Sequence, residues 1–202
     1  HLLEHMLFLG NEQFPEANAF NDYIATHGGN INALTGTEYS SYFYEVAAEH
    51  ESQALTHLYA MLSKPIFCEA LIEKEINAID AEFLLKQKDD LRRLYQVHKE
   101  TVNPAHPFSK FSVGNLDTLS DSADSYLRDE LISFYEQHYC ASRMKLVIQS
   151  DQTLDQQEQL IRGMFSAVEN RGVHVEALTM PLYTTDQLQR SIWVESLNGH
   201  KK

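Results

Sequence analysis

The first ten residues of the chain, His-Leu-Leu-Glu-His-Met-Leu-Phe-Leu-Gly, constrain its fold more than any other stretch. On a helix with about 100° between successive residues, His1, Glu4 and His5 fall on one face. The rest of this helix is apolar, so we expect it to be buried. The apolar residues are Leu2, Leu3, Met6, Leu7 and Leu9. Gly10 and Asn11 should end the helix. Two imidazoles one turn apart, with a carboxylate beside them, can hold one metal ion.

The order of these polar residues, His-x-x-Glu-His, is that of the inverted zinc-protease signature. Two histidines four residues apart on a buried helix are also common as core or capping residues, so the motif needs support from elsewhere in the chain. A catalytic zinc takes three protein ligands and keeps a fourth position for water. The motif therefore predicts a third ligand outside the first ten residues.

Length and charge limit the classes of function that the chain can have. Its 202 residues, 43% of them hydrophobic, suffice for one large domain or two small ones with a real core. The formal net charge of −13 argues against a nucleic-acid partner, because few cations are left to neutralise phosphates. No stretch approaches the ~20 apolar residues of a membrane span. Since the chain opens inside a helix and without methionine, we interpret it as part of a longer polypeptide.

Hydrophobic periodicity predicts alternating helices and strands. Helices are expected at residues 14–27, 51–63, from 69 past 85 towards 94, 125–139 (with Phe134 facing inward) and 151–165. Strands are expected at residues 30–35, 40–47, 145–150 (buried) and 191–195, whereas 173–186 has little pattern. The first two strands should form a β-hairpin around Gly36-Thr37-Glu38. These elements predict an α+β fold, a mixed or antiparallel sheet with helices packed on it.

The long helix predicted from residue 69 offers candidates for the third ligand. Glu75 and Glu82 are two helical turns apart and therefore lie within about 20° of each other around the helix. Both lie beside the apolar stripe of this helix, which consists of Ile72, Ile76, Ile79 and Phe83. Glutamates in this position often only form a solvated face with neighbouring lysines. Two histidines, one glutamate and a water would complete a catalytic zinc site, but the helix geometry leaves open which glutamate is the ligand.

Taken together, two segments resemble one known family, the pitrilysin/insulin-degrading-enzyme family of inverted-motif zinc peptidases. They are His1 to Gly10 and the stretch Glu75-Ile76-Asn77-Ala78-Ile79-Asp80-Ala81-Glu82. Further similarity lies in the stretch from Asn103 to Phe111, in Gly114-Asn115 and in Thr118-Leu119. The resemblance runs from His1 to about Glu169. It implies a two-layer α+β metallohydrolase domain, which we expect to span residues 1–202 as a single N-terminal zinc-peptidase domain.

The resemblance also implies roles for the residues of the two motifs. It makes His1, His5 and Glu82 the ligands of a Zn²⁺ cofactor and Glu4 the general base of catalysis. Glu75, the first glutamate of the pair, would support the site from behind the ligands and is counted with Glu4 among the catalytic residues. The separation of His5 and Glu82 in sequence fits the family.

Asn32-Ala33-Leu34-Thr35 resembles the edge strand of the family that binds substrate, so Asn32, Ala33 and Leu34 are the expected substrate-binding residues. The implied function is that of a zinc-dependent endopeptidase of relaxed specificity. Its expected partners are peptides and the remaining domains of the same polypeptide, which the family uses to enclose its substrate. The strand that leads into the zinc helix in the family is missing here, so we expect the isolated chain to be poorly active. The resemblance implies a periplasmic location, with the cytoplasm as the alternative.

The competing hypothesis is a non-catalytic zinc-binding or interaction domain, because relatives of this fold serve as structural subunits after losing motif residues. Glu4 is present in this chain. A purely structural zinc site is also more often closed by four protein ligands. Both observations favour the peptidase.

Overall fold

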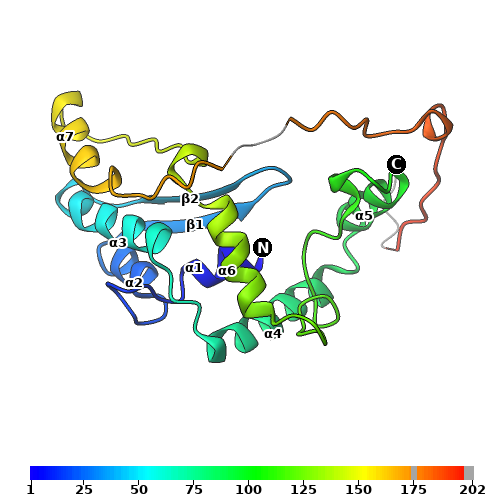
Figure 1. The fold of residues 1–202 in the computed structure, drawn as a ribbon, viewed down its shortest axis with the longest axis horizontal. Helices are drawn as coiled ribbons and strands as arrows, with labels where there is room; N and C mark the ends of the chain where they lie inside the picture. Colours follow the sequence, from blue (N-terminus) through cyan, green and yellow to red (C-terminus); the bar gives the residue numbers. More distant parts are fainter. Residues whose placement is uncertain (174–176, 198–202) are drawn as a thin grey trace. The chain divides into compact units, whose positions relative to one another are not determined.

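The computed structural model describes residues 1–173 and 177–197 (Figure 1). The described residues form two compact units. The first draws on residues 1–75 and 120–173, and the second on residues 76–119 and 177–197. Each unit has its own packed interior: Ile24 and Leu55 in the first and Ile79 and Val102 in the second are at most 1% exposed.

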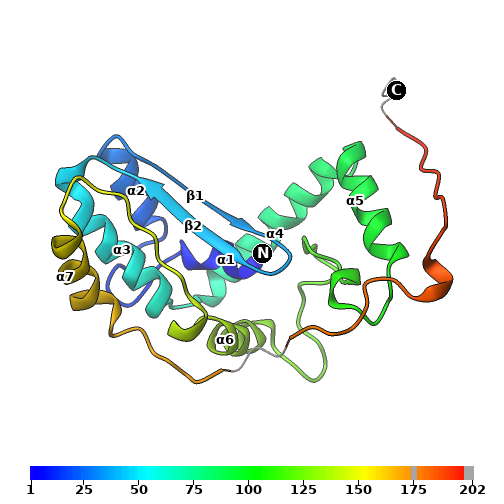
Figure 2. The same cartoon turned by 90° about the horizontal axis from the view of Figure 1, so that it is seen from above.

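The first unit consists of helices packed on a β-hairpin (Figures 1 and 2). Its elements are α1 (Leu2–Leu7), α2 (Ala19–Thr26), β1 (Asn30–Thr35), β2 (Ser40–Glu45), a 3₁₀ turn at Ala48–His50, α3 (Glu51–Ser63), α6 (Leu127–His138), a 3₁₀ turn at Ala141–Arg143 and α7 (Leu154–Phe165). Helices α1 and α2 pack against β1, while α3 packs against α2 and α7. This arrangement confirms the α+β class that the sequence predicted.

The predicted hairpin is confirmed. Strands β1 and β2 pair antiparallel, in a register that runs from Asn30 opposite Glu45 to Thr35 opposite Ser40. Gly29, directly before β1, allows the two strands to approach at their open end, because a Cβ atom there would lie 2.1 Å from the carbonyl oxygen of Glu45. Any other residue at position 29 would push β1 away from its partner.

The apolar side of α1 is buried, as expected, and consists of Leu2, Leu3, Met6 and Leu7. The next helix was expected from residue 14, but α2 begins only at Ala19. The reason lies in Asn11, whose side-chain oxygen accepts hydrogen bonds from the backbone N–H groups of Gln13 and Phe14. This local turn competes with a helical start. Helix α3 has the bounds that its periodicity predicted.

Helix α4 (Glu69–Lys86) continues through the residues at which the two units are divided. The second unit also contains α5 (Asp90–Thr101) and 3₁₀ turns at Pro107–Ser109 and Thr185–Gln187. The helix predicted from residue 69 past 85 is confirmed, but its continuation towards Leu94 is wrong, because α4 stops at Lys86. The side chain of Asp89 accepts a hydrogen bond from the N–H of Arg92 at 2.9 Å and so caps a new helix, α5.

The strands predicted at residues 145–150 and 191–195 are absent from the described part of the structure. Val147 and Trp193, which were expected in these strands, are each 91% exposed. Without a neighbouring strand to receive their backbone hydrogen bonds, β-prone residues do not form a ladder. The helices predicted around 125–139 and 151–165 are confirmed as α6 and α7, but Phe134 of α6 is 51% exposed rather than inward-facing.

Residues 177–184 contain no helix or strand, in line with the weak pattern noted for 173–186, of which 174–176 lie outside the described residues. Among the described residues, no helix is both long enough and apolar enough to cross a membrane.

Candidate active site

Helix α1 presents its three polar side chains on the side that is not packed into the core. His1, Glu4 and His5 are half-buried, whereas the apolar residues beside them (Leu2, Leu3, Met6 and Leu7) are buried. The imidazole rings of His1 and His5 lie with their centroids 4.7 Å apart and at an angle of 74°. The amphipathic pattern of the first ten residues therefore brings the two imidazoles together, as the sequence predicted.

Glu75 of α4 meets one of these imidazoles directly. Its Oε2 lies 2.9 Å from Nδ1 of His5, and the two side chains are 22% and 26% exposed. Because a carboxylate can only accept, Nδ1 of His5 carries the proton and donates it. In the neutral ring the other nitrogen, Nε2, then has a free lone pair, which is the form in which a histidine binds a metal.

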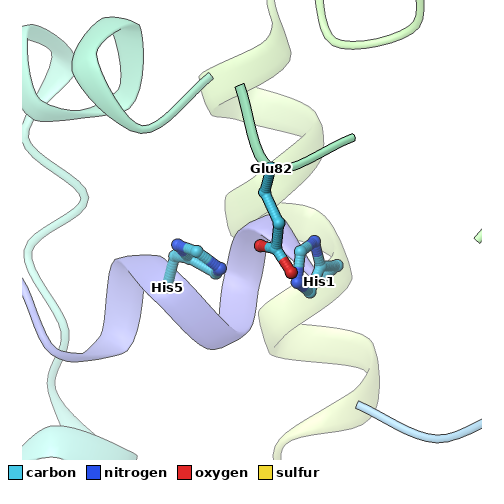
Figure 3. Close-up of side chains that lie close together, drawn as sticks. All are labelled: His1, His5 and Glu82. Atoms are coloured by element: carbon cyan, nitrogen blue, oxygen red, sulfur yellow. The ribbon is translucent and has the colours of Figure 1, made fainter. Parts of the chain in front are cut away.

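Glu82 lies two turns further along the same helix and on nearly the same side as Glu75. The side chains of His1, His5 and Glu82 lie close together (Figure 3). One potential ligand atom from each lies within 4.8 Å of the other two. Glu82 Oε1 also accepts a hydrogen bond from Lys86, one turn later on α4.

The three residues fit a zinc ion in chemistry and in spacing. Two imidazoles and one carboxylate are a donor set of catalytic zinc sites, with the fourth position left to water. Ligand atoms at the usual ~2.0–2.1 Å from zinc lie about 3.4 Å from one another in a tetrahedron. His1, His5 and Glu82 supply this donor set, with one potential ligand atom from each within 4.8 Å of the others.

The carboxylate of Glu4 has a partner that the sequence did not reveal. The hydroxyl of Thr35, the last residue of β1, donates a hydrogen bond to Oε2 of Glu4. Nothing in the spacing of the two residues predicts this contact, because it depends on how α1 packs against β1. The only available signal was a hydroxyl residue at the end of the strand that follows the motif.

The expected substrate-binding residues Asn32, Ala33 and Leu34 lie on β1, which has one neighbour, β2, among the described strands. The N–H of Gly36 donates a hydrogen bond to the carbonyl oxygen of Tyr39. Because the pairing alternates along an antiparallel strand, the backbone N–H and C=O groups of the even-numbered residues of β1 point towards β2, and those of the odd-numbered residues point away from it. The N–H of Ala33 is accordingly on the open edge, where it donates to Oδ1 of Asn32 at 2.9 Å. Leu34 is 40% exposed.

A pair of tyrosines, which the sequence analysis did not identify, lies close to Glu4. The hydroxyl oxygens of Tyr42, on β2, and Tyr139, after α6, are 2.7 Å apart. Burial raises the pKa of Tyr42 strongly, with further contributions from Tyr139 and from the negative charge of Glu4. Tyr42 therefore remains a neutral phenol next to the carboxylate.

Comparison with solved structures assigns the fold to a class of peptidases. A crystal structure of pitrilysin superposes with a TM-score of 0.86 and 37% sequence identity, covering 93% of this chain and 20% of that chain. Residues 1–106 match the family model of insulinase (peptidase family M16), and residues 126–195 match the peptidase M16 inactive domain. The chain belongs to peptidase family M16, which confirms the resemblance inferred from the motifs.

Curated relatives of known name extend over most of the chain. The A-factor-processing enzyme of Saccharomyces cerevisiae is 36% identical over 205 residues, which is 100% of this chain and 20% of the relative. Human insulin-degrading enzyme is 36% identical over 86% of the chain and 17% of the relative. Protease 3 of Escherichia coli K12 is 35% identical over 93% of the chain and 19% of the relative. The chain thus spans about a fifth of the length of these relatives.

Proposed function

We propose that the chain carries the catalytic centre of a zinc-dependent endopeptidase. The observation that carries this proposal is the geometry of α1, which presents two imidazoles to one point with a carboxylate beside them. Family membership supports peptide hydrolysis as the reaction, and the motif lies within the part that matches the peptidase model. In this proposal His1, His5 and Glu82 hold the zinc, and Glu75 fixes the tautomer of His5 through its hydrogen bond.

A zinc ion held by these residues would supply a bound water with a pKa near 7 and would polarise the scissile carbonyl. Glu4 would perform the proton transfers. Its carboxylate would accept one proton as the water oxygen bonds to the carbonyl carbon, and would deliver this proton to the nitrogen as the C–N bond breaks. Each cleavage consumes one water, and Glu4 returns to its ionised state.

The open edge of β1 provides the means to hold an extended peptide. The backbone groups of Ile31, Ala33 and Thr35 face away from β2 and can pair with a substrate strand whatever its sequence. To use the N–H of Ala33, the peptide must displace the side chain of Asn32 that now occupies it. Because the relatives are about five times as long as this chain, we further propose that other segments of the polypeptide complete the substrate site.

The test is a glutamate substitution in the full polypeptide, assayed with an internally quenched peptide and with zinc analysis. Glu4→Gln should keep the zinc and the fold but lose kcat/KM by at least the ~10²–10⁴-fold that general base catalysis contributes. Glu16→Gln, which changes an exposed glutamate in the loop before α2, is the matched control and should behave as wild type.

If Glu4→Gln cleaves at a near-normal rate with zinc in place, Glu4 is not the base. If the wild-type polypeptide binds zinc at the motif and cleaves no peptide, the non-catalytic binding domain is the correct class.

A further inference from the structure

The hydrogen bond between Thr35 and Glu4 joins the end of β1 to the middle of α1. The hydroxyl of Thr35 donates to Oε2 of Glu4 across 31 residues of sequence. The donor is the hydroxyl, because an ionised carboxylate has only acceptor atoms. One of the two carboxylate oxygens of Glu4, Oε2, is thus bonded to the hairpin, and the other, Oε1, takes no part in this hydrogen bond.

A second hydroxyl holds Thr35 in turn. Ser40, the first residue of β2, is paired with Thr35 in the register of the hairpin, and the two side-chain oxygens are 3.5 Å apart. A hydroxyl group donates one proton and accepts through two lone pairs. Ser40 can therefore donate to Thr35 while Thr35 donates to Glu4.

Thr35 also belongs to the open edge of β1. Since Gly36 bonds to Tyr39 and Ala33 points its N–H away from β2, the backbone of Thr35 faces the open edge with Ala33. The side chain of a strand residue is roughly perpendicular to the edge direction. One residue thus touches Glu4 through its side chain and offers its backbone to the edge where the peptide is proposed to lie.

We propose that Thr35 is a positioning residue. Its hydroxyl holds the carboxylate of Glu4 in the orientation for proton transfer, at a fixed position relative to the peptide that pairs with β1. This inference rests on the proposed function, because it assigns Thr35 to the reaction that Glu4 would perform. Thr35 acts through Glu4 and through the peptide backbone, and its hydroxyl takes no proton from the substrate.

The experiment compares Thr35→Val and Thr35→Ser in the full polypeptide with the same quenched peptide. Valine keeps the shape and the β-branching of threonine but removes the hydroxyl. Thr35→Val should lower kcat by about 10- to 100-fold, the size expected for losing a hydrogen bond to a charged group. KM should change less than about twofold, and zinc content not at all, because the substitution removes an interaction of the base rather than of the peptide or the metal. Thr35→Ser should restore most of kcat.

Thr37→Val is the matched control, since it makes the same chemical change at an exposed position in the turn of the same hairpin. It should leave kcat and KM unchanged. In the Glu4→Gln background, Thr35→Val should have no further effect on the residual rate, because the two residues act as one unit.

The proposal is overturned if Thr35→Val leaves kcat unchanged, if its loss appears mainly in KM, or if serine fails to restore the rate. Equal losses for Thr35→Val with Glu4 present and absent would show a structural role of Thr35 alone. Absence of cleavage by the zinc-binding wild-type polypeptide, in contrast, would remove the proposed function itself, so the two failures are distinguishable.

Discussion

At the scale of single residues, the two glutamates of α4 make different contacts although they lie on the same side of one helix. Glu75 lies 2.9 Å from Nδ1 of His5. Glu82, two turns later, has a carboxylate oxygen within 4.8 Å of a ring nitrogen of each histidine and is also bonded to Lys86. Their identical chemistry and nearly identical helical phase did not separate these contacts in the sequence; the separation arises from their different heights along α4.

His57 shows how burial acts on a histidine that lies away from the candidate active site. Its ring stacks on Phe14 at 3.8 Å, Tyr23 at 5.0 Å and Phe20 at 5.4 Å between centroids. Within the described residues its buried Nδ1 has no hydrogen-bond partner. Burial lowers the pKa of His57 below its ordinary value of 6.5, so the folded state disfavours the imidazolium.

We therefore expect His57→Phe to reduce the acid sensitivity of the fold. Below pH 6.5 the unfolded chain protonates His57 while the folded chain resists, so the free energy of unfolding decreases as the pH falls towards the lowered pKa. One such group contributes at most ~1.4 kcal/mol per pH unit. Phenylalanine fits the aromatic stack and takes up no proton. Urea unfolding at pH 7.5 and 5.5 should show a smaller difference for the variant, and equal differences for both proteins would contradict the assignment.

At the scale of elements, hydrogen bonds from backbone N–H groups to polar side chains influence where helices begin. The side chain of Asn11 delays α2, and Asp89 starts α5 where the apolar pattern alone suggested a continuous helix. Thr153 and Gln156 form a reciprocal capping box at the start of α7. Asp89 and Thr153 satisfy backbone N–H groups that the first turn of a helix leaves unpaired, whereas Asn11 holds the N–H groups of Gln13 and Phe14 in a turn before α2.

Asp89→Ala should destabilise α5 by about 0.5–2 kcal/mol, the usual cost of losing an N-cap side chain. The neighbouring substitution Gln87→Ala truncates an exposed side chain between α4 and α5 and should lower the free energy of unfolding by less than about 0.5 kcal/mol. Hydrogen exchange of the amides in α5, compared between the two variants, measures the difference at this helix. Equal protection in both variants would show that Asp89 does not determine the start of α5.

At the scale of the whole molecule, the candidate metal ligands belong to an acidic protein with a formal net charge of −13. Such a charge raises the local concentration of cations and does not attract anionic polymers. The candidate ligand Glu82 lies on helix α4. An ion that binds only the folded state should raise the free energy of unfolding of the chain.

Zinc should raise the Tm of the chain, because an ion at 100 times its Kd stabilises the state that binds it by about 2.7 kcal/mol. Glu82→Gln should lose most of this shift and lower the zinc affinity sharply, whereas Glu75→Gln should lower the affinity by the ~10- to 100-fold typical of residues that orient a ligand. Glu69→Gln, exposed in the first turn of α4, is the control. Unchanged stoichiometry and affinity in Glu82→Gln would exclude this residue as a ligand and make Glu75 the candidate.

The sequence by itself determined the α+β class, the hairpin of β1 and β2, the bounds of α3 and the clustering of His1 and His5, because each follows from periodicity within one continuous segment. It also identified the family through motifs that occupy fixed positions along the chain. The contact of Glu75 with His5, the hydrogen bond from Thr35 to Glu4 and the exposure of Val147 were decided only by the tertiary structure. These features join or separate segments far apart in sequence, and no local pattern encodes which distant side chain a given residue will meet.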